Sequence, residues 1–227
     1  MHQDHTSLCP EKDSVLPKDV CVSIERNTKS GKSVYDIQYP NGFIRPLCAS
    51  KKEKADLYAD YINKNHTKGK VAIHSDSGSL INGKHSGISA CSAVVFLPDW
   101  HKVTSSQIFY GVQPSEGELY GILTGLRLGR MMGLHEQPTV FRSDCQTAIM
   151  QIEGASRCKV PCAMKIIQAI KHEASQYRTL EFEWIPRERN FEADALCSRT
   201  LRRYERDIIS FTPTIKENMS NVLFFNS

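Results

Sequence analysis

Residues 138–148, PTVFRSDCQTA, combine a short apolar strand pattern, an acid and the start of a helix. The strand covers residues 139–143, Asp144 follows it directly, and residues 145–149 begin a helix. A strand that ends on an acid just before a helix places that carboxylate at the C-terminal edge of a sheet, where α/β proteins bind their ligands. This segment therefore predicts an α/β fold with Asp144 at the ligand-binding edge.

Three other acids have comparable settings. Asp76 follows the apolar run 71–73, and Glu118 lies at the start of a helix expected from about residue 115. Asp194 lies in the first turn of a helix that follows a strand at 180–185. The four acids are far apart in the sequence, so only the fold can bring them together.

The first part of the chain predicts a small separate module. We expect a disordered lead over residues 1–17, a β-β-β-α module over residues 18–63 and a basic linker over residues 64–70. Residues 18–70 hold 11 Lys and Arg against 6 Asp and Glu, whereas the whole chain has a net charge of only +4. This asymmetry indicates a polyanion partner such as nucleic acid, or a solvated basic face.

The second part, residues 71–207, alternates strands and helices. We expect strands at 71–76, 88–97 and 105–112, with a Gly- and Ser-rich turn at 77–86. A helix at 115–133, the strand before Asp144, a helix at 161–177, the strand at 180–185 and a helix at 190–207 follow. This order describes a mixed sheet flanked by helices, with residues 208–227 as a C-terminal tail.

The helix around Glu118 carries a row of glycines. They recur every fourth residue and lie on one face: Gly121, Gly125, Gly129 and Gly133. Each glycine costs roughly 0.5 to 1 kcal/mol of helix stability relative to alanine. We therefore expect the helix backbone to approach the sheet closely along this face.

Each acid also has a purely structural explanation. Glu118 lies three residues after Ser115, the spacing of a capping box, and Asp194 complements a helix dipole. Asp144 could cap its helix, and Asp76 could hydrogen-bond within its own turn. Each explanation accounts for one acid, but none accounts for the positions of the acids relative to one another. A right-handed crossover places the strands of Asp76 and Asp144 side by side and parallel, so these two acids are expected to be neighbours.

Four converging carboxylates repel one another unless a cation neutralises them. Oxygen ligands without His or Cys suit magnesium or manganese. A cluster that holds two ions about 4 Å apart is suited to in-line displacement at phosphorus. The pattern thus favours a metal-dependent enzyme acting on a phosphodiester.

Four short sequence segments resemble the motifs of the ribonuclease H family, in particular its type 1 enzymes. They are DSGS at 76–79, GELYGI at 117–122, SDCQ at 143–146 and NFEADAL at 190–196. The resemblance covers about residues 70–203 and implies a five-stranded mixed sheet and two Mg²⁺ ions, for which Mn²⁺ can substitute. It implies that Asp76 bridges both ions, that Glu118 and Asp144 hold the ion near the leaving group, and that Asp194 holds the ion that carries the attacking water.

The resemblance also implies a substrate and a reaction. These are the RNA strand of an RNA–DNA hybrid and its endonucleolytic cleavage to a 3′-hydroxyl and a 5′-phosphate. Choice of the RNA strand needs contact with the 2′-hydroxyl, for which Glu118 and the backbone near Gly78 are candidates. Further candidates for substrate binding are Ser77, Ser79, Arg187, Arg189 and Asn190.

The chain departs from the family pattern in three places. Ser77 stands where the family usually has Gly after its first Asp, and PRER at 186–189 replaces a His-containing loop, as in the plant and archaeal variants. No basic protrusion follows the helix that begins at Pro161. The surface that binds the hybrid is therefore expected in another part of the chain, and the basic module at 18–63 is the first candidate.

We therefore predict a metal-dependent ribonuclease H. A non-catalytic module of the same fold that binds nucleic acid or protein is the alternative, and an exonuclease of this fold is a third. Arginines at helical spacing in the last helix form either a phosphate track or a solvated face: Arg199, Arg202, Arg203 and Arg206.

The remaining expectations concern surroundings. No window approaches roughly 18 consecutive apolar residues, and residues 1–17 are polar, so we expect no membrane span and no signal peptide. This favours an intracellular protein of the nucleus or cytoplasm. The tail at 208–227 ends in an apolar run and is predicted to dock a protein partner or add a strand, with disorder as the alternative.

Overall fold

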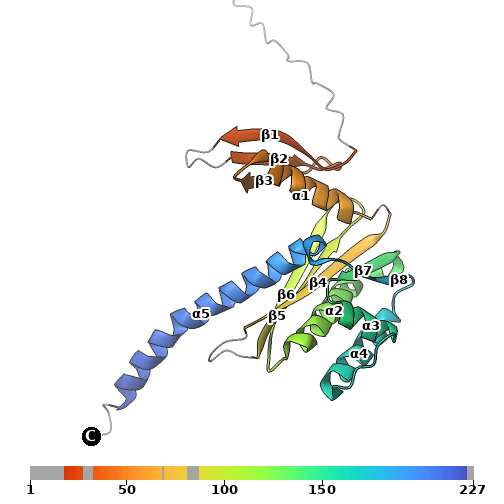
Figure 1. Ribbon diagram of the computed structural model, residues 1–227. Helices are drawn as coiled ribbons and strands as arrows, with labels where there is room; N and C mark the ends of the chain where they lie inside the picture. The colour runs from red at the N-terminus through yellow and green to blue at the C-terminus, as the bar shows by residue number, and fades with distance from the viewer. Residues whose placement is uncertain (1–17, 28–32, 68, 81–86, 224–227) are drawn as a thin grey trace, which may run out of the picture. The chain divides into compact units, whose positions relative to one another are not determined.

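The computed structural model describes residues 18–27, 33–67, 69–80 and 87–223 (Figure 1). The chain forms two compact units that divide between Lys64 and Asn65. The predicted lead at 1–17 lies outside the described residues.

The first unit is a three-stranded antiparallel sheet with one helix, as predicted. Its strands β1 (Cys21–Asn27), β2 (Ser33–Gln38) and β3 (Ile44–Ala49) pair in sequence order, and α1 (Lys52–Asn65) follows. Alternating side chains of β2 and of the residue that follows it are buried, and so are small and aliphatic side chains of the helix: Tyr35, Ile37, Tyr39, Ala55, Ala59 and Ile62. The unit therefore has a core of its own.

The second unit contains a five-stranded mixed sheet in the order β6-β5-β4-β7-β8. Its strands are β4 (Val71–Leu80), β5 (Ile88–Phe96), β6 (Lys102–Tyr110), β7 (Thr139–Ser143) and β8 (Leu180–Trp184). Strands β4, β5 and β6 pair antiparallel, whereas β4, β7 and β8 run parallel. The predicted mixed sheet is confirmed, with β4 at its centre.

The predicted end of β4 is wrong. Residues 77–80 were expected in a turn, but they continue the strand and pair with β5 up to Leu80 and Ile88. The partner strand β5 is buried along its whole length, and its alignment with Ser77 to Leu80 supplies backbone hydrogen bonds that outweigh the turn tendency of Gly and Ser. The predicted turn residues 81–86 lie outside the described part.

Helices cover both faces of this sheet (Figure 1). On one face lie α2 (Pro114–Met131), α3 (Gln146–Glu153) and α4 (Pro161–Ala174), which share a buried apolar core with β4 and β7. On the other face lies α5 (Phe191–Leu223). Two short 3-10 turns, η2 (Leu134–Glu136) and η3 (Arg187–Arg189), precede β7 and α5.

The glycines of α2 bring its backbone against β4 and β7, as predicted for three of the four. A Cβ at Gly121 would lie 3.0 Å from the carbonyl oxygen of Asp76, and one at Gly125 would lie 2.8 Å from the ring of Phe141. Gly133 differs, because it follows the helix in a left-handed conformation with φ of 73°. The close contact places the first turns of α2 directly beside Asp76.

The last helix is longer than predicted. It was expected to end near Asp207, with a tail beyond, but α5 runs on to Leu223. No glycine follows Asp207 to form a C-terminal cap, and the single Pro213 does not end the helix. Within the described residues, no helix is long and apolar enough to span a membrane.

Candidate active site

Asp76 and Asp144 lie side by side at the edge predicted from the sequence. In the parallel pair of β4 and β7, Ser75 aligns with Ser143, so each acid follows an aligned residue. The side chain of Asp76 is buried, whereas Asp144 is half-buried. Beyond Ser75, strand β4 pairs only with β5, so the edge that faces Asp144 is not covered by another strand.

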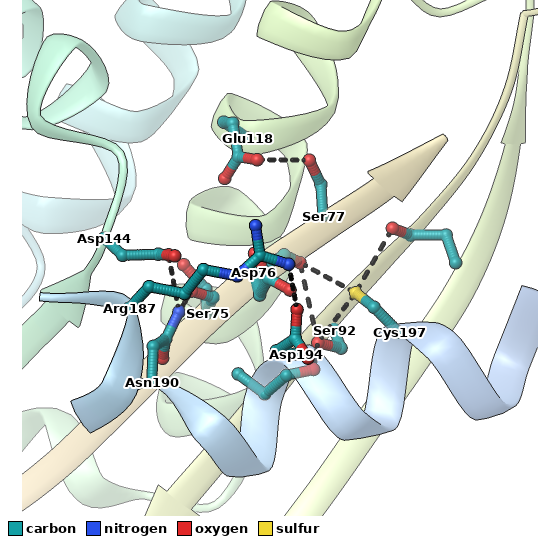
Figure 2. Close-up of polar contacts among 12 residues, drawn as sticks. Ser75, Asp76, Ser77, Ser92, Glu118, Asp144, Arg187, Asn190, Asp194 and Cys197 are labelled. Atoms are coloured by element: carbon teal, nitrogen blue, oxygen red, sulfur yellow. Dashed lines mark hydrogen bonds and ion pairs between the residues drawn. The ribbon is translucent and has the colours of Figure 1, made fainter. Parts of the chain in front are cut away.

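Glu118 reaches the same place from α2 because it does not cap that helix. The capping box uses Gln113 and Glu116, whose Oε2 accepts the Gln113 N–H at 3.1 Å. Glu118 instead accepts a hydrogen bond from Ser77 Oγ at 2.7 Å through Oε1 (Figure 2). Its other oxygen, Oε2, is buried and has no hydrogen-bond partner in the described structure.

Asp194 comes from the first turn of α5 and is paired with an arginine. Arg187 Nη2 donates to Asp194 Oδ1 at 2.8 Å, while the Arg187 side chain is 76% exposed. Figure 2 shows the guanidinium reaching across from η3 toward the acids. Arg187 is therefore the positive group that partly neutralises this cluster in the protein alone.

Asn190 holds Asp144 in place. It is fully buried, and its Nδ2 donates to Asp144 Oδ1 at 2.7 Å and to the carbonyl of Ser75 at 2.8 Å. It was proposed from the sequence as a substrate contact. Its burial gives it a positioning role, because it ties the start of α5 to the ends of β4 and β7.

Two further polar contacts, not foreseen from the sequence, fix α5 against the sheet near Asp76. The Cys197 thiol donates to the carbonyl of Asp76 at 3.2 Å, and Ser92 Oγ donates to the carbonyl of Ala193 at 2.8 Å. Both contacts are buried and appear in Figure 2. They hold the helix that carries Asp194 against the strand that carries Asp76.

The electrostatics show that the acids are mutually close. Burial, followed by the charges of Glu118, Asp144 and Asp194, raises the pKa of Asp76 to about 8. Burial also raises the pKa of Glu118 to about 7, against the hydrogen bond from Ser77, which lowers it. A buried carboxyl at Asp76 and a half-buried one at Glu118 that resist ionisation near neutral pH mark a place where positive charge binds favourably.

The other sequence candidates have different settings. Gly78 faces α5, where a Cβ would lie 3.1 Å from Leu201 Cδ1, and Ser79 hydrogen-bonds Ser89 at 2.7 Å. Arg189 is half-buried, and its charge acts on the buried His74, whose pKa is lowered first by burial, then by Arg142 and then by Arg189.

The donor set fits a divalent cation that prefers oxygen. In the part of the chain that the structure describes, no three His, Cys, Asp or Glu side chains are gathered tightly enough to enclose an ion as they stand. The buried, unpartnered Glu118 Oε2 and the raised pKa of Asp76 are nevertheless what a cation would relieve. To take part in holding such a cation, Asp194 would have to exchange its arginine partner for it.

The sheet order, the two helical layers and the position of the acids define a ribonuclease H-like protein. The chain belongs to the family described as Reverse transcriptase-like, whose model matches residues 76–200. This family assignment and the solved neighbours support a nuclease of the ribonuclease H type.

Three matches, one to a sequence and two to solved structures, illustrate the relationship. The bifunctional protein Rv2228c of Mycobacterium tuberculosis is 30% identical over 131 residues, which are 57% of this chain and 35% of that protein. The chain thus matches about a third of the length of that curated relative. The solved N-terminal RNase H domain of Rv2228c has a TM-score of 0.54 at 26% identity, covering 61% of this chain and 98% of that one.

The third is LC11-RNase H1, solved in complex with an RNA/DNA hybrid. Its TM-score is 0.52 at 23% identity, and the match covers 58% of this chain and 99% of that one. At this identity the likeness shows the fold.

Proposed function

We propose that the second unit is a metal-dependent endoribonuclease that cuts the RNA strand of RNA–DNA hybrids. The convergence of Asp76, Glu118, Asp144 and Asp194 carries the proposal, because burial, followed by the charges of neighbouring acids, raises the pKa values of Asp76 and Glu118. The hybrid seen bound to LC11-RNase H1 and the RNase H domain of the mycobacterial relative support the choice of substrate.

The four acids are the residues that would hold two Mg²⁺ ions, with Mn²⁺ as a substitute. Such ions, when bound, lower the pKa of an attacking water and stabilise the leaving oxygen. The protein supplies the positions: Ser77 orients Glu118, and Asn190 orients Asp144. Asp194 stands opposite them on the rigid start of α5.

Selection of the RNA strand is assigned to the region between Glu118 and the open edge of β4. A 2′-hydroxyl both donates and accepts hydrogen bonds, and it is the group that distinguishes RNA from DNA. Glu118 and Ser77 offer an acceptor and a hydroxyl at this place, next to the backbone of Gly78, which lies in the part of β4 beyond Ser75 that pairs only with β5. Phosphate contact is assigned to the exposed Arg187.

The test is cleavage of an internally labelled hybrid, with duplex RNA and duplex DNA of the same sequence as comparisons, in EDTA, MgCl₂ and MnCl₂. We expect internal cuts in the RNA of the hybrid only, and only with metal. Asp144→Asn should abolish cleavage with the fold intact, whereas Glu153→Gln, an exposed acid of α3, should cleave like the wild type. Shortening from the ends, which a circular substrate would prevent, contradicts endonucleolytic action.

One observation favours a non-catalytic binding module as the second candidate. The ion pair between Arg187 and Asp194 gives the cluster a counter-charge without any metal. Under this alternative, hybrid binding is the same in EDTA and MgCl₂, is unchanged in Asp144→Asn, and no strand is cut.

A further inference from the structure

Four arginines form an exposed positive face on α5. Arg199, Arg202, Arg203 and Arg206 are spaced i, i+3, i+4 and i+7, and all are exposed. None of them forms an ion pair with any residue in the described part of the chain. Like charges at this spacing repel and lower the stability of a helix. No packing contact of the arginines among the described residues offsets this loss.

The side of α5 that contacts the sheet uses other residues. Cys197 and Leu201 lie against β4, Thr200 Oγ1 hydrogen-bonds Ser106 at 2.9 Å, and Tyr204 contacts the ring of Tyr110. The helix is therefore fixed to the sheet without any contribution from the arginines, which leaves their guanidinium groups free for a ligand.

The arginine face lies on the same helix as Asp194 and follows it along the chain. At about 100° of rotation per residue, Phe191, Ala195, Arg199, Arg202 and Arg206 fall within one sector of roughly 80°. Phe191 is 52% exposed and stands three residues before Asp194. The row thus begins with an exposed aromatic ring about one helical turn before Asp194 and proceeds through a small residue to the arginines.

The length of the arginine row matches the spacing of phosphates along a strand. Arg199 and Arg206 are separated by about 10 Å along the helix axis, and phosphates of one strand follow one another every 3.4 Å along a duplex, so the row spans about three phosphates.

We propose that this face of α5 binds the phosphate backbone of the nucleic acid whose scissile bond lies at the acid cluster. The proposal rests on the proposed function and extends it, because it identifies the surface that binds the duplex beyond the cleavage site. Phosphate oxygens match guanidinium forks. Arg199 and Arg206 lie about 8 and 18 Å from Asp194 along the helix axis. At 3.4 Å per phosphate, the face would contact phosphates roughly two to five nucleotides from the cut. An exposed aromatic ring followed by arginines suits a strand that carries bases as well as phosphates.

The test uses the full chain with two charges removed, Arg202→Gln/Arg206→Gln. The control is Lys171→Gln/Arg178→Gln, which removes two exposed charges near the start of β8, at the end of the sheet opposite to the acids. Binding of a fluorescent hybrid is measured in EDTA over a range of salt concentrations. We expect the arginine variant to bind about tenfold more weakly at 0.1 M salt and to lower the salt slope by about 1 to 2, because each lost phosphate contact removes about 0.9.

Cleavage in MgCl₂ then locates the contact. The loss should disappear when the hybrid is truncated to two nucleotides on one side of the cut, and persist when the other side is truncated. A slope and affinity equal to those of the control overturn the proposal, as does a variant that loses binding only to vesicles of anionic lipid or to an acidic peptide.

The two proposals fail separately. If the wild type cuts hybrid and the arginine variant matches the control, the α5 face is a solvated surface and the enzyme stands. If the wild type cuts nothing but the salt slope still falls in the arginine variant, the face binds nucleic acid and the catalytic proposal is withdrawn.

Discussion

Replacing Asp76 by Asn should stabilise the metal-free protein at neutral pH. The pKa of Asp76 is raised from its ordinary value of 3.8 to about 8, mainly by burial and then by the neighbouring acids. The folded state therefore binds a proton that the unfolded state has already lost. Stability from this proton is complete below about pH 4 and is lost as the pH rises through about 8.

The magnitude follows from the shift. At pH 7 the solution is just over three pH units above the pKa of an unfolded Asp and still below the folded pKa of about 8. Each unit corresponds to 1.36 kcal/mol, so the wild type loses up to about 4 kcal/mol of folding stability relative to low pH. Asn has nearly the same shape and does not titrate. The stability difference between Asp76→Asn and the wild type should therefore grow in favour of the variant from about pH 4 to about pH 8.

Tryptophan fluorescence during urea unfolding measures this, because Trp100 and Trp184 both lie in the second unit. In EDTA the variant should gain stability relative to wild type as pH rises, whereas Glu153→Gln should show no such trend. Excess MgCl₂ should stabilise the wild type and not the variant, since binding to the native state adds stability. A difference that is constant over pH, or that shrinks as pH rises, refutes the reasoning.

Three more changes test the geometry around the acids. Gly121→Ala should destabilise the protein by about 1 to 3 kcal/mol in urea despite its better helix propensity, because the new methyl meets the Asp76 carbonyl at 3.0 Å; unchanged or increased stability would contradict the close contact. Asn190→Ala should cost about 1 to 3 kcal/mol and reduce cleavage, since Asp144 loses a buried donor; normal cleavage would show that this hydrogen bond is dispensable. Arg187→Gln should lower the Mg²⁺ concentration needed for half-maximal thermal stabilisation, because the guanidinium competes for its carboxylate; an unchanged or higher requirement would argue against competition.

The sequence was sufficient for the sheet and for the pairing of two of the acids. The strand before Asp144 and the strand of Asp76 are apolar, and the crossover rule makes such strands parallel neighbours, which the register of β4 and β7 confirms. The end of β4 was not predictable from local chemistry. Its Ser- and Gly-rich continuation has turn character by itself and becomes a strand only because β5 supplies partners.

The position of Glu118 shows why a site needs more than local motifs. Ser115 and Glu118 match the spacing of a capping box, which explained the acid without any function. Pro114 is the stronger signal, because proline favours the first helical position and has no N–H to be capped. It makes Gln113 the cap and Glu116 its partner in the capping box, so Glu118 is not needed to cap the helix.

Glu118 also depends on the glycines of α2 for its contact with β4. A Cβ at Gly117 would lie 3.1 Å from Ser77 Oγ, the same hydroxyl that donates to Glu118, and Gly121 meets the Asp76 carbonyl one turn later. The helix stability given up at these glycines thus fixes the separation between two acids of the cluster. A row of small residues that looks like a packing feature in the sequence is, in the fold, a determinant of how closely the carboxylates of α2 and β4 approach.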